Sequence, residues 1–140
     1  MRAWLWGLSL LLLLAPGVAP AANFSCFGAE RLEDDAFSIV FTRGSAKIPE
    51  AARSPLAAAI DAALAEPDRN ICILGHAGQE GGATTSITLA AQRARAVAAA
   101  LASHGVGNER LRSEARSAQF SPRARALEPP SRTVTIVLMP

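Results

Sequence analysis

The chain has 140 residues, of which 50% are hydrophobic and 19% are charged, and its formal net charge is +2 at neutral pH. This length suits one domain and excludes a two-domain enzyme, a TIM barrel and a long repeat array. The charge excludes an obvious nucleic-acid partner, because the basic excess is small and no dense run of basic residues is present. Residues 110–132 are mildly basic and could meet an anionic partner, although such a run is more often a solvated surface.

The first 21 residues are predicted to be a cleaved export signal. Arg2 supplies a positive start, residues 4–15 are apolar, and residues 19–21 (APA) have the small-x-small pattern of a signal-peptidase site. The apolar stretch falls short of the ~20 residues that a membrane-spanning helix needs, although an uncleaved membrane anchor is the alternative. We place cleavage after Ala21. The mature chain is therefore expected in the periplasm, in association with the outer membrane or the cell wall, with no transmembrane segment.

Two cysteines, Cys26 and Cys72, would then meet an oxidising compartment. An even count in an exported chain favours a disulfide between them. The alternative is that Cys72, which lies in an apolar run, is a free and buried core residue.

The mature chain is predicted to begin with a polar, acidic lead-in over residues 22–35. In chain order, the following elements are a strand at 37–41, a helix capped by Ser54 and ended by Pro67, a strand at 71–75, a glycine-containing loop at 76–85, a helix from about 86 to 103, a weaker strand at 110–116 and a strand at 133–138. The continuous apolar run at 71–75 is typical of a strand that is covered on both faces. The order β-α-β-α-(β)-β predicts an α+β domain over residues 36–139, a two-layer sandwich with its helices packed on one sheet.

Arg93 is the position that most needs an explanation. It lies four residues from both Leu89 and Val97, so it shares the apolar face of the second predicted helix. A guanidinium on such a face is rarely buried without an anionic partner, and its planar fork suits a carboxylate. The partner is either a ligand or an acidic side chain of the chain itself; a third possibility is that Arg93 snorkels at the edge of the apolar face.

Several short motifs resemble the C-terminal domain of the OmpA-like family. Residues 73–81 read ILGHAGQEG and residues 89–94 read LAAQRA, where the family shows G-H/Y-T-D-x-x-G followed by N-x-x-L-S-x-x-R-A. Smaller matches are Phe41 with Gly44-Ser45-Ala46, Gly105-Val106 after the long helix, and Ser131-Arg132-Thr133-Val134 beside the closing N-R-R-V of the family. The resemblance covers nearly all of the mature chain.

The resemblance implies an OmpA-like fold and noncovalent binding of peptidoglycan through the diaminopimelate of its peptide stem. The family's arginine, which matches Arg93, takes a carboxylate of the ligand. The family's aspartate takes the ammonium of the same amino-acid end. One fixed cation beside one fixed anion is what a zwitterionic group requires.

The chain departs from this pattern around the ligand. Gly78 stands at the aspartate position, Ala77 at the preceding threonine, Ser86 at the asparagine and Ala90 at the serine after Leu89. Loss of a charge partner in a partly desolvated site costs ~2–5 kcal/mol, so binding is expected to be weak. Glu80, two residues further along, is a candidate substitute for the missing carboxylate.

We therefore expect a periplasmic envelope protein that binds peptidoglycan, with Arg93, Gly78, Glu80, Ser86 and Arg132 as ligand-binding positions. The alternative is a degenerate OmpA-like module that acts as a protein–protein adaptor in the envelope without cell-wall binding. An enzyme is not expected, because the sequence lacks G-x-S-x-G and H-E-x-x-H motifs. Neither a cofactor nor a metal is expected, and His76, at a strand end, is expected to be a hydrogen-bonded structural residue.

Overall fold

The computed structural model describes residues 23–80, 83–117 and 130–140. The predicted signal at 1–21 lies outside these residues. The helices and strands, in chain order, are η1 (Ala29–Arg31), β1 (Ala36–Val40), η2 (Glu50–Ala52), α1 (Arg53–Ala65), β2 (Ile71–His76), β3 (Gly78–Glu80), β4 (Ala83–Thr85), α2 (Ile87–Ser103), η3 (Asn108–Arg110), β5 (Leu111–Arg116), η4 (Pro130–Arg132) and β6 (Thr133–Leu138). None of the helices in the described part of the chain is long and apolar enough to cross a membrane.

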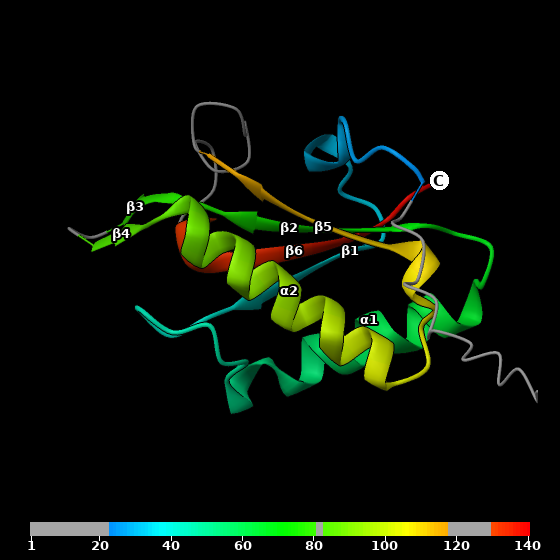
Figure 1. The fold of residues 1–140 in the computed structure, drawn as a ribbon. Helices are drawn as coiled ribbons and strands as arrows, with labels where there is room; N and C mark the ends of the chain where they lie inside the picture. The colour runs from blue at the N-terminus through cyan, green and yellow to red at the C-terminus, as the bar shows by residue number, and fades with distance from the viewer. Residues whose placement is uncertain (1–22, 81–82, 118–129) are drawn as a thin grey trace, which may run out of the picture.

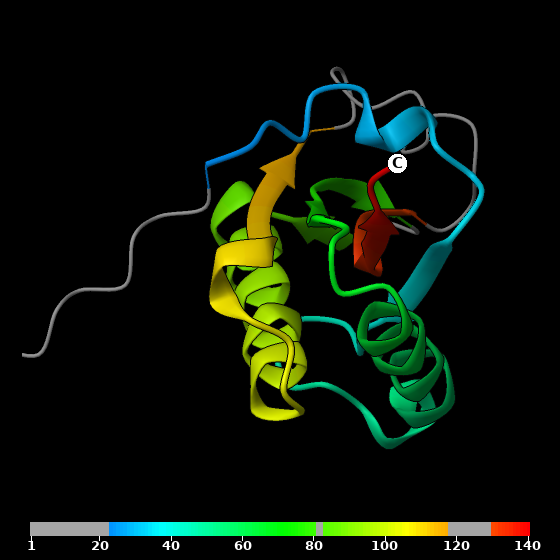
Figure 2. The same ribbon diagram turned by 90° about the vertical axis from the view of Figure 1, so that its right-hand side faces the viewer.

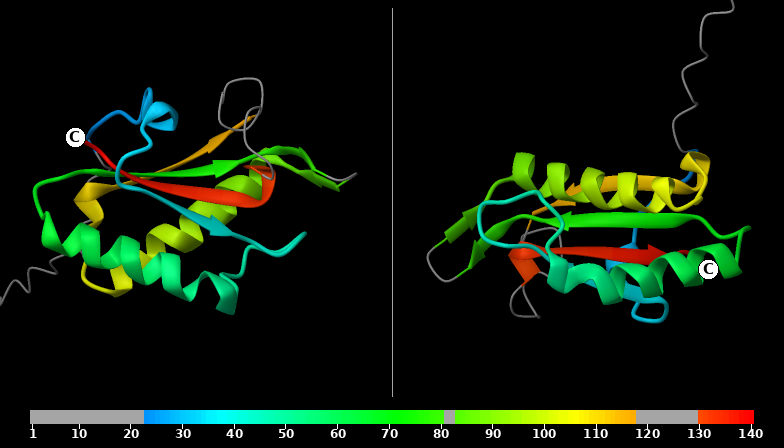
Figure 3. Two further views of the ribbon diagram at one scale, coloured as in Figure 1. Left: turned by 180° about the vertical axis from the view of Figure 1, so that it is seen from behind. Right: turned by 90° about the horizontal axis from the view of Figure 1, so that it is seen from below.

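The main sheet has the order β1-β6-β2-β5, and β3 and β4 form a separate hairpin (Figure 1). β6 runs antiparallel to both of its neighbours, whereas β2 and β5 are parallel. Helices α1 and α2 lie side by side across one face of the sheet (Figure 3). The predicted α+β sandwich, with its helices packed on one sheet, is confirmed.

Two clusters of buried side chains lie on opposite faces of the sheet, because neighbouring residues of a strand point to opposite sides. The larger cluster lies beneath the helices and includes Ile73 of β2, Ile136 of β6 and Val97 of α2. The smaller cluster joins Cys72 and Leu74 of β2 to the N-terminal segment. The apolar run of β2 is therefore covered on both faces, and all six of its residues are buried.

The second cover comes from the segment predicted as a polar lead-in. It crosses the sheet on the face away from the helices (Figure 2). Cys26 and Ala29 are buried there, with Phe24 and Leu32 packed against them. A disulfide joins Cys26 to Cys72, as the even cysteine count predicted. The ordered structure thus extends to the N-terminal side of residue 36.

The two helix starts differ in how well the sequence predicted them. The second predicted helix begins where expected, at Ile87, and Ser86 caps it: its hydroxyl oxygen accepts a hydrogen bond from the Leu89 amide at 3.0 Å. Ser54 does not cap α1, so that prediction is wrong. The turn η2 precedes α1 directly and the helix begins at Arg53, which places Pro55 inside the first turn, where the absence of its N–H removes no helical bond.

Gly75 allows β2 and α2 to approach closely. A methyl group added at this position would lie 2.7 Å from the carbonyl carbon of Ala90 in α2 and closer still to its oxygen. Because these atoms belong to the backbone, the whole helix would have to move. We expect Gly75→Ala to lower the free energy of unfolding by about 3 kcal/mol, as measured by urea denaturation.

The matched control for this variant is Gly44→Ala. Gly44 has a φ of 71° and open space around its position, so only backbone strain of about 1 kcal/mol is expected there. A smaller loss of stability for Gly75→Ala than for Gly44→Ala would contradict the close approach as the reason for glycine at position 75.

Candidate functional site

Arg93 lies at the end of the sheet where β1 and β2 finish and β6 begins. The turn after β1, the β3–β4 hairpin, the start of α2 and η4 gather at this end (Figure 1). The side chain of Arg93 extends inward from α2 and is 1% exposed, which makes it one of the largest fully buried side chains in the described residues. The helical spacing predicted this inward orientation.

Four hydrogen bonds hold the guanidinium of Arg93 against these segments. Its Nε donates to the carbonyl oxygen of Ser45 at 2.7 Å, and one Nη donates to the carbonyl oxygen of Thr42 at 3.2 Å. The other Nη donates to the hydroxyl of Thr85 at 3.2 Å and to the carbonyl oxygen of Ser131 at 3.3 Å. The arginine therefore ties α2 to β4, to η4 and to the turn after β1.

An aromatic ring completes the surroundings of Arg93. Its guanidinium carbon lies 5.4 Å from the centre of the Phe41 ring, within the range of a cation–π contact. Phe41 is itself 1% exposed, and its amide donates to the carbonyl oxygen of Arg132 at 2.8 Å. The family-matched residues that follow β1 and those that precede β6 thus meet around one arginine.

The other predicted site residues lie at the same end of the sheet but have different roles. Ser86 is exposed, and its hydroxyl caps α2. Arg132 is half-buried in η4. Glu80 belongs to β3, and its side chain lies outside what the structure describes.

Gly78 adopts a backbone conformation that favours glycine. Its φ is 149°, in a region that residues with a Cβ rarely adopt. It opens β3, where it pairs with Thr85. An aspartate at this position, as in the family pattern, would be strained in this hairpin, which gives a physical reason for the departure.

His76, the neighbouring residue of the same motif, is structural. It is 1% exposed, and its Nε2 lies 2.9 Å from the hydroxyl of Thr135 in β6. This hydrogen bond crosses from β2 to the adjacent strand and satisfies a buried polar group, as expected.

Sequence reasoning missed Thr42, Ser45, Thr85 and Ser131 as partners of Arg93. Three of these four residues contribute only a backbone carbonyl, and any residue type can supply that group. A signal was present for Ser45 and Ser131, since both stand within segments that match the family pattern.

Comparisons with known proteins agree with this architecture. A sequence profile of the OmpA family matches residues 40–132. No curated protein sequence matches the chain.

Solved structures similar to the chain share its fold. The peptidoglycan-associated lipoprotein from Burkholderia pseudomallei is 21% identical, with a TM-score of 0.56 over 74% of this chain and 90% of that one. A MotB-like protein from Desulfovibrio vulgaris is 19% identical, with a TM-score of 0.59 over 74% and 71% of the two chains. The cell wall anchor of the type VI secretion system from Pseudomonas aeruginosa is 20% identical, with a TM-score of 0.57 over 75% and 81%. The chain belongs to the OmpA family.

Proposed function

We propose that the protein associates noncovalently with peptidoglycan in the periplasm, through the end of the sheet at which Arg93 lies. The observation that carries the proposal is Arg93 itself. The family's ligand-binding arginine is retained, turned inward, and bonded to the segments that form this face. Membership of the OmpA family supports the same conclusion. The names of two similar structures, a peptidoglycan-associated lipoprotein and a cell wall anchor, point in the same direction.

The group that Arg93 would take is a carboxylate of the peptide stem. Its Nη atoms form bonds of 3.2–3.3 Å to neutral oxygens, longer than the ~2.7–2.9 Å that is usual between a guanidinium and a carboxylate. A carboxylate is a stronger acceptor and would replace one or more of these bonds. The shorter bond from Nε to Ser45 would remain and keep the side chain in place.

The remaining predicted positions would surround this carboxylate. Ser86 places the N-terminus of α2, which favours an anion, beside the site. Arg132 adds a second cation, and Gly78 allows the backbone conformation with positive φ at the start of the hairpin. Glu80 would supply the carboxylate that binds the ammonium of the ligand. Because Arg93 must exchange existing partners, and the family aspartate is missing, we expect weaker binding than the complete motif would support.

Cosedimentation with purified diaminopimelate-type sacculi tests the proposal. We expect the mature protein to pellet with sacculi and Arg93→Lys to bind about tenfold more weakly, because lysine keeps the charge but loses the planar fork. The control is Arg95→Ala, which removes an exposed arginine from the same helix and should leave pelleting unchanged. Circular dichroism would confirm that each variant is folded.

Two results would contradict parts of the proposal. If folded Arg93→Lys pelleted as well as the unaltered protein, Arg93 would not be the ligand cation. If the unaltered protein did not pellet, peptidoglycan association would be wrong, and an adaptor role in the envelope would become the better hypothesis.

A further inference from the structure

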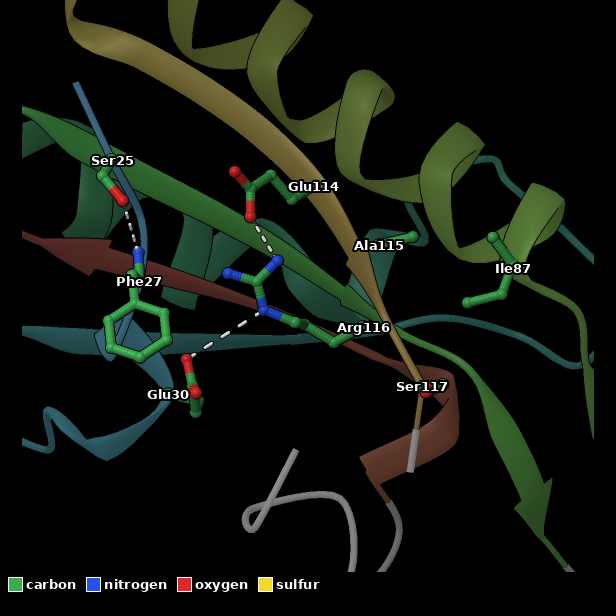
Figure 4. Close-up of a pocket in the computed structure, with 8 residues that line it drawn as sticks. All are labelled: Ser25, Phe27, Glu30, Ile87, Glu114, Ala115, Arg116 and Ser117. Carbon is green, nitrogen blue, oxygen red and sulfur yellow. Dashed lines mark hydrogen bonds and ion pairs between the residues drawn. The ribbon is translucent and has the colours of Figure 1, made fainter. Parts of the chain in front are cut away.

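A pocket elsewhere on the molecule shares none of its lining residues with the Arg93 site. It has a volume of about 710 Å³ and lies between the N-terminal segment, the end of β5 and the start of α2 (Figure 4). The lining residues are Ser25, Phe27, Glu30, Ile87, Glu114, Ala115, Arg116 and Ser117.

The N-terminal wall of this pocket is firmly attached to the sheet. The disulfide from Cys26 to Cys72 holds it at one point. Two arginines of β5 hold it at others, since Arg112 donates to the carbonyl oxygen of Phe24 at 2.7 Å and Arg116 donates to that of Cys26 at 3.2 Å. The pocket is therefore built by covalent and hydrogen-bonded contacts.

One of the two lining carboxylates is already fully engaged. The two oxygens of Glu114 accept hydrogen bonds from Arg112, at 2.6 Å, and from Arg116. Burial raises the pKa of Glu114, but the hydrogen bonds and charges of these two arginines outweigh it and hold the pKa below its usual range. Glu114 is therefore an ionised structural partner of the arginines, and both of its oxygens are already hydrogen-bonded.

The other lining carboxylate, Glu30, has one oxygen that accepts no hydrogen bond within the described residues. Its side chain is only 11% exposed, and its Oε2 is buried without a hydrogen bond in the described part of the chain. The nearest cationic atom in the described ion pairs is Nε of Arg116, at 4.0 Å, which is an ion pair but not a hydrogen bond (Figure 4). The hydroxyl of Ser117, also on the lining, is a second buried polar group without a hydrogen bond. Buried polar groups of this kind normally have a partner, and a carboxylate oxygen can only accept, so Glu30 lacks a donor.

The rim of the pocket is apolar and exposed. Phe27 is 87% exposed and Ile87 is 51% exposed, and they are two of the four large hydrophobic residues that the described surface exposes. Exposed apolar side chains gathered at a polar pocket are typical of a binding surface.

We infer that this pocket binds a primary ammonium group carried on an aliphatic chain. The ammonium donates to the carboxylate of Glu30, and the aliphatic chain lies against Phe27, the apolar residue nearest to Glu30 on the lining (Figure 4). The charges support a cation, because the lining contains two carboxylates and one guanidinium. An anion would meet the carboxylate of Glu30, which repels it, whereas the charge of Glu114 is already compensated by Arg112 and Arg116. A lysine side chain of a partner and a free alkylamine both have this chemistry.

Nuclear magnetic resonance titration of the mature, oxidised protein tests the inference. The probes are N-acetyl-lysine methylamide, its norleucine counterpart, whose side chain lacks the ammonium and ends in a methyl group at the ε-carbon, and n-hexylamine. We expect saturable shifts of the amides of Phe27, Glu30 and Ser117 at millimolar lysine probe, and about tenfold weaker binding of the norleucine probe. Saturation by the lysine probe alone would assign the site to peptide lysines, and saturation by n-hexylamine to free amines as well.

A pair of variants locates the charge that matters. Glu30→Gln keeps the size of the side chain and should weaken the lysine probe about tenfold. Glu33→Gln removes an exposed carboxylate from the same segment and should have no effect. Equal binding of the lysine and norleucine probes, unchanged binding to Glu30→Gln, or no saturable shifts with either amine would each overturn the inference.

Discussion

Replacing Arg93 by alanine is expected to lower the free energy of unfolding by about 4 kcal/mol, one of the two largest effects that we predict for this chain. The variant would remove all four hydrogen bonds to Thr42, Ser45, Thr85 and Ser131 and leave their oxygens facing a cavity. Each buried acceptor that loses its partner costs ~1–3 kcal/mol, and relaxation or entry of water recovers part of the sum. The measurement is urea unfolding followed by circular dichroism.

Two further variants show whether the loss belongs to these contacts. Arg95→Ala, on the exposed side of α2, should change stability by no more than ~0.5 kcal/mol. The loss of stability in Arg93→Lys should lie between those of Arg93→Ala and Arg95→Ala. An ammonium can form some of the four hydrogen bonds but cannot reproduce the planar geometry of the guanidinium. A loss below about 1 kcal/mol for Arg93→Ala would contradict the role of Arg93 as the residue that ties these segments together.

The stabilising role of Arg93 also bears on the proposed function. The same guanidinium would hold the face in shape and supply the cation for a ligand carboxylate. Stability and sacculus binding are therefore measured on different variants. Arg93→Ala reports on the fold, and folded Arg93→Lys reports on binding.

Much of the fold could be predicted because the periodic signals were strong. The apolar stripe of α2 located that helix within about a residue at each end. The uninterrupted apolar run of β2 predicted a strand covered on both faces, and all six residues of β2 are buried. It could also have predicted that the N-terminal segment packs on the sheet, because the two helices can cover only one face. The acidic residues of that segment obscured its apolar ones, Phe24, Ala29 and Leu32.

The candidate site was harder to predict, because its contacts depend on backbone atoms. Helical spacing showed that Arg93 points inward but not which oxygens it meets. All four are carbonyl or hydroxyl oxygens, and two of them belong to Thr42 and Thr85, which lie outside the matched motifs. The positive φ of Gly78 follows from the hairpin and not from the residue's identity. The pocket at Glu30 depends on where the N-terminal segment crosses the sheet, which is a tertiary contact without a local signal.

Removal of the disulfide is the other large effect, an expected loss of about 4 kcal/mol. Cys26 and Cys72 are 46 residues apart, so the cross-link restricts a long loop of the unfolded chain and lowers its entropy. We expect reductant to lower the free energy of unfolding of the unaltered protein, measured by urea denaturation, by this amount and to leave that of a Cys26→Ala/Cys72→Ala double variant unchanged. The reduced protein keeps both sulfur atoms in the core, so comparing it with the oxidised protein isolates the cross-link from packing.

Because Cys26 lies in the smaller core cluster with Cys72, Leu74 and Val137, reduction should first loosen the N-terminal segment from that face of the sheet. Faster amide hydrogen exchange in residues 24–32 than in α2 after reduction would support this order, and equal stability of the two redox forms would contradict it.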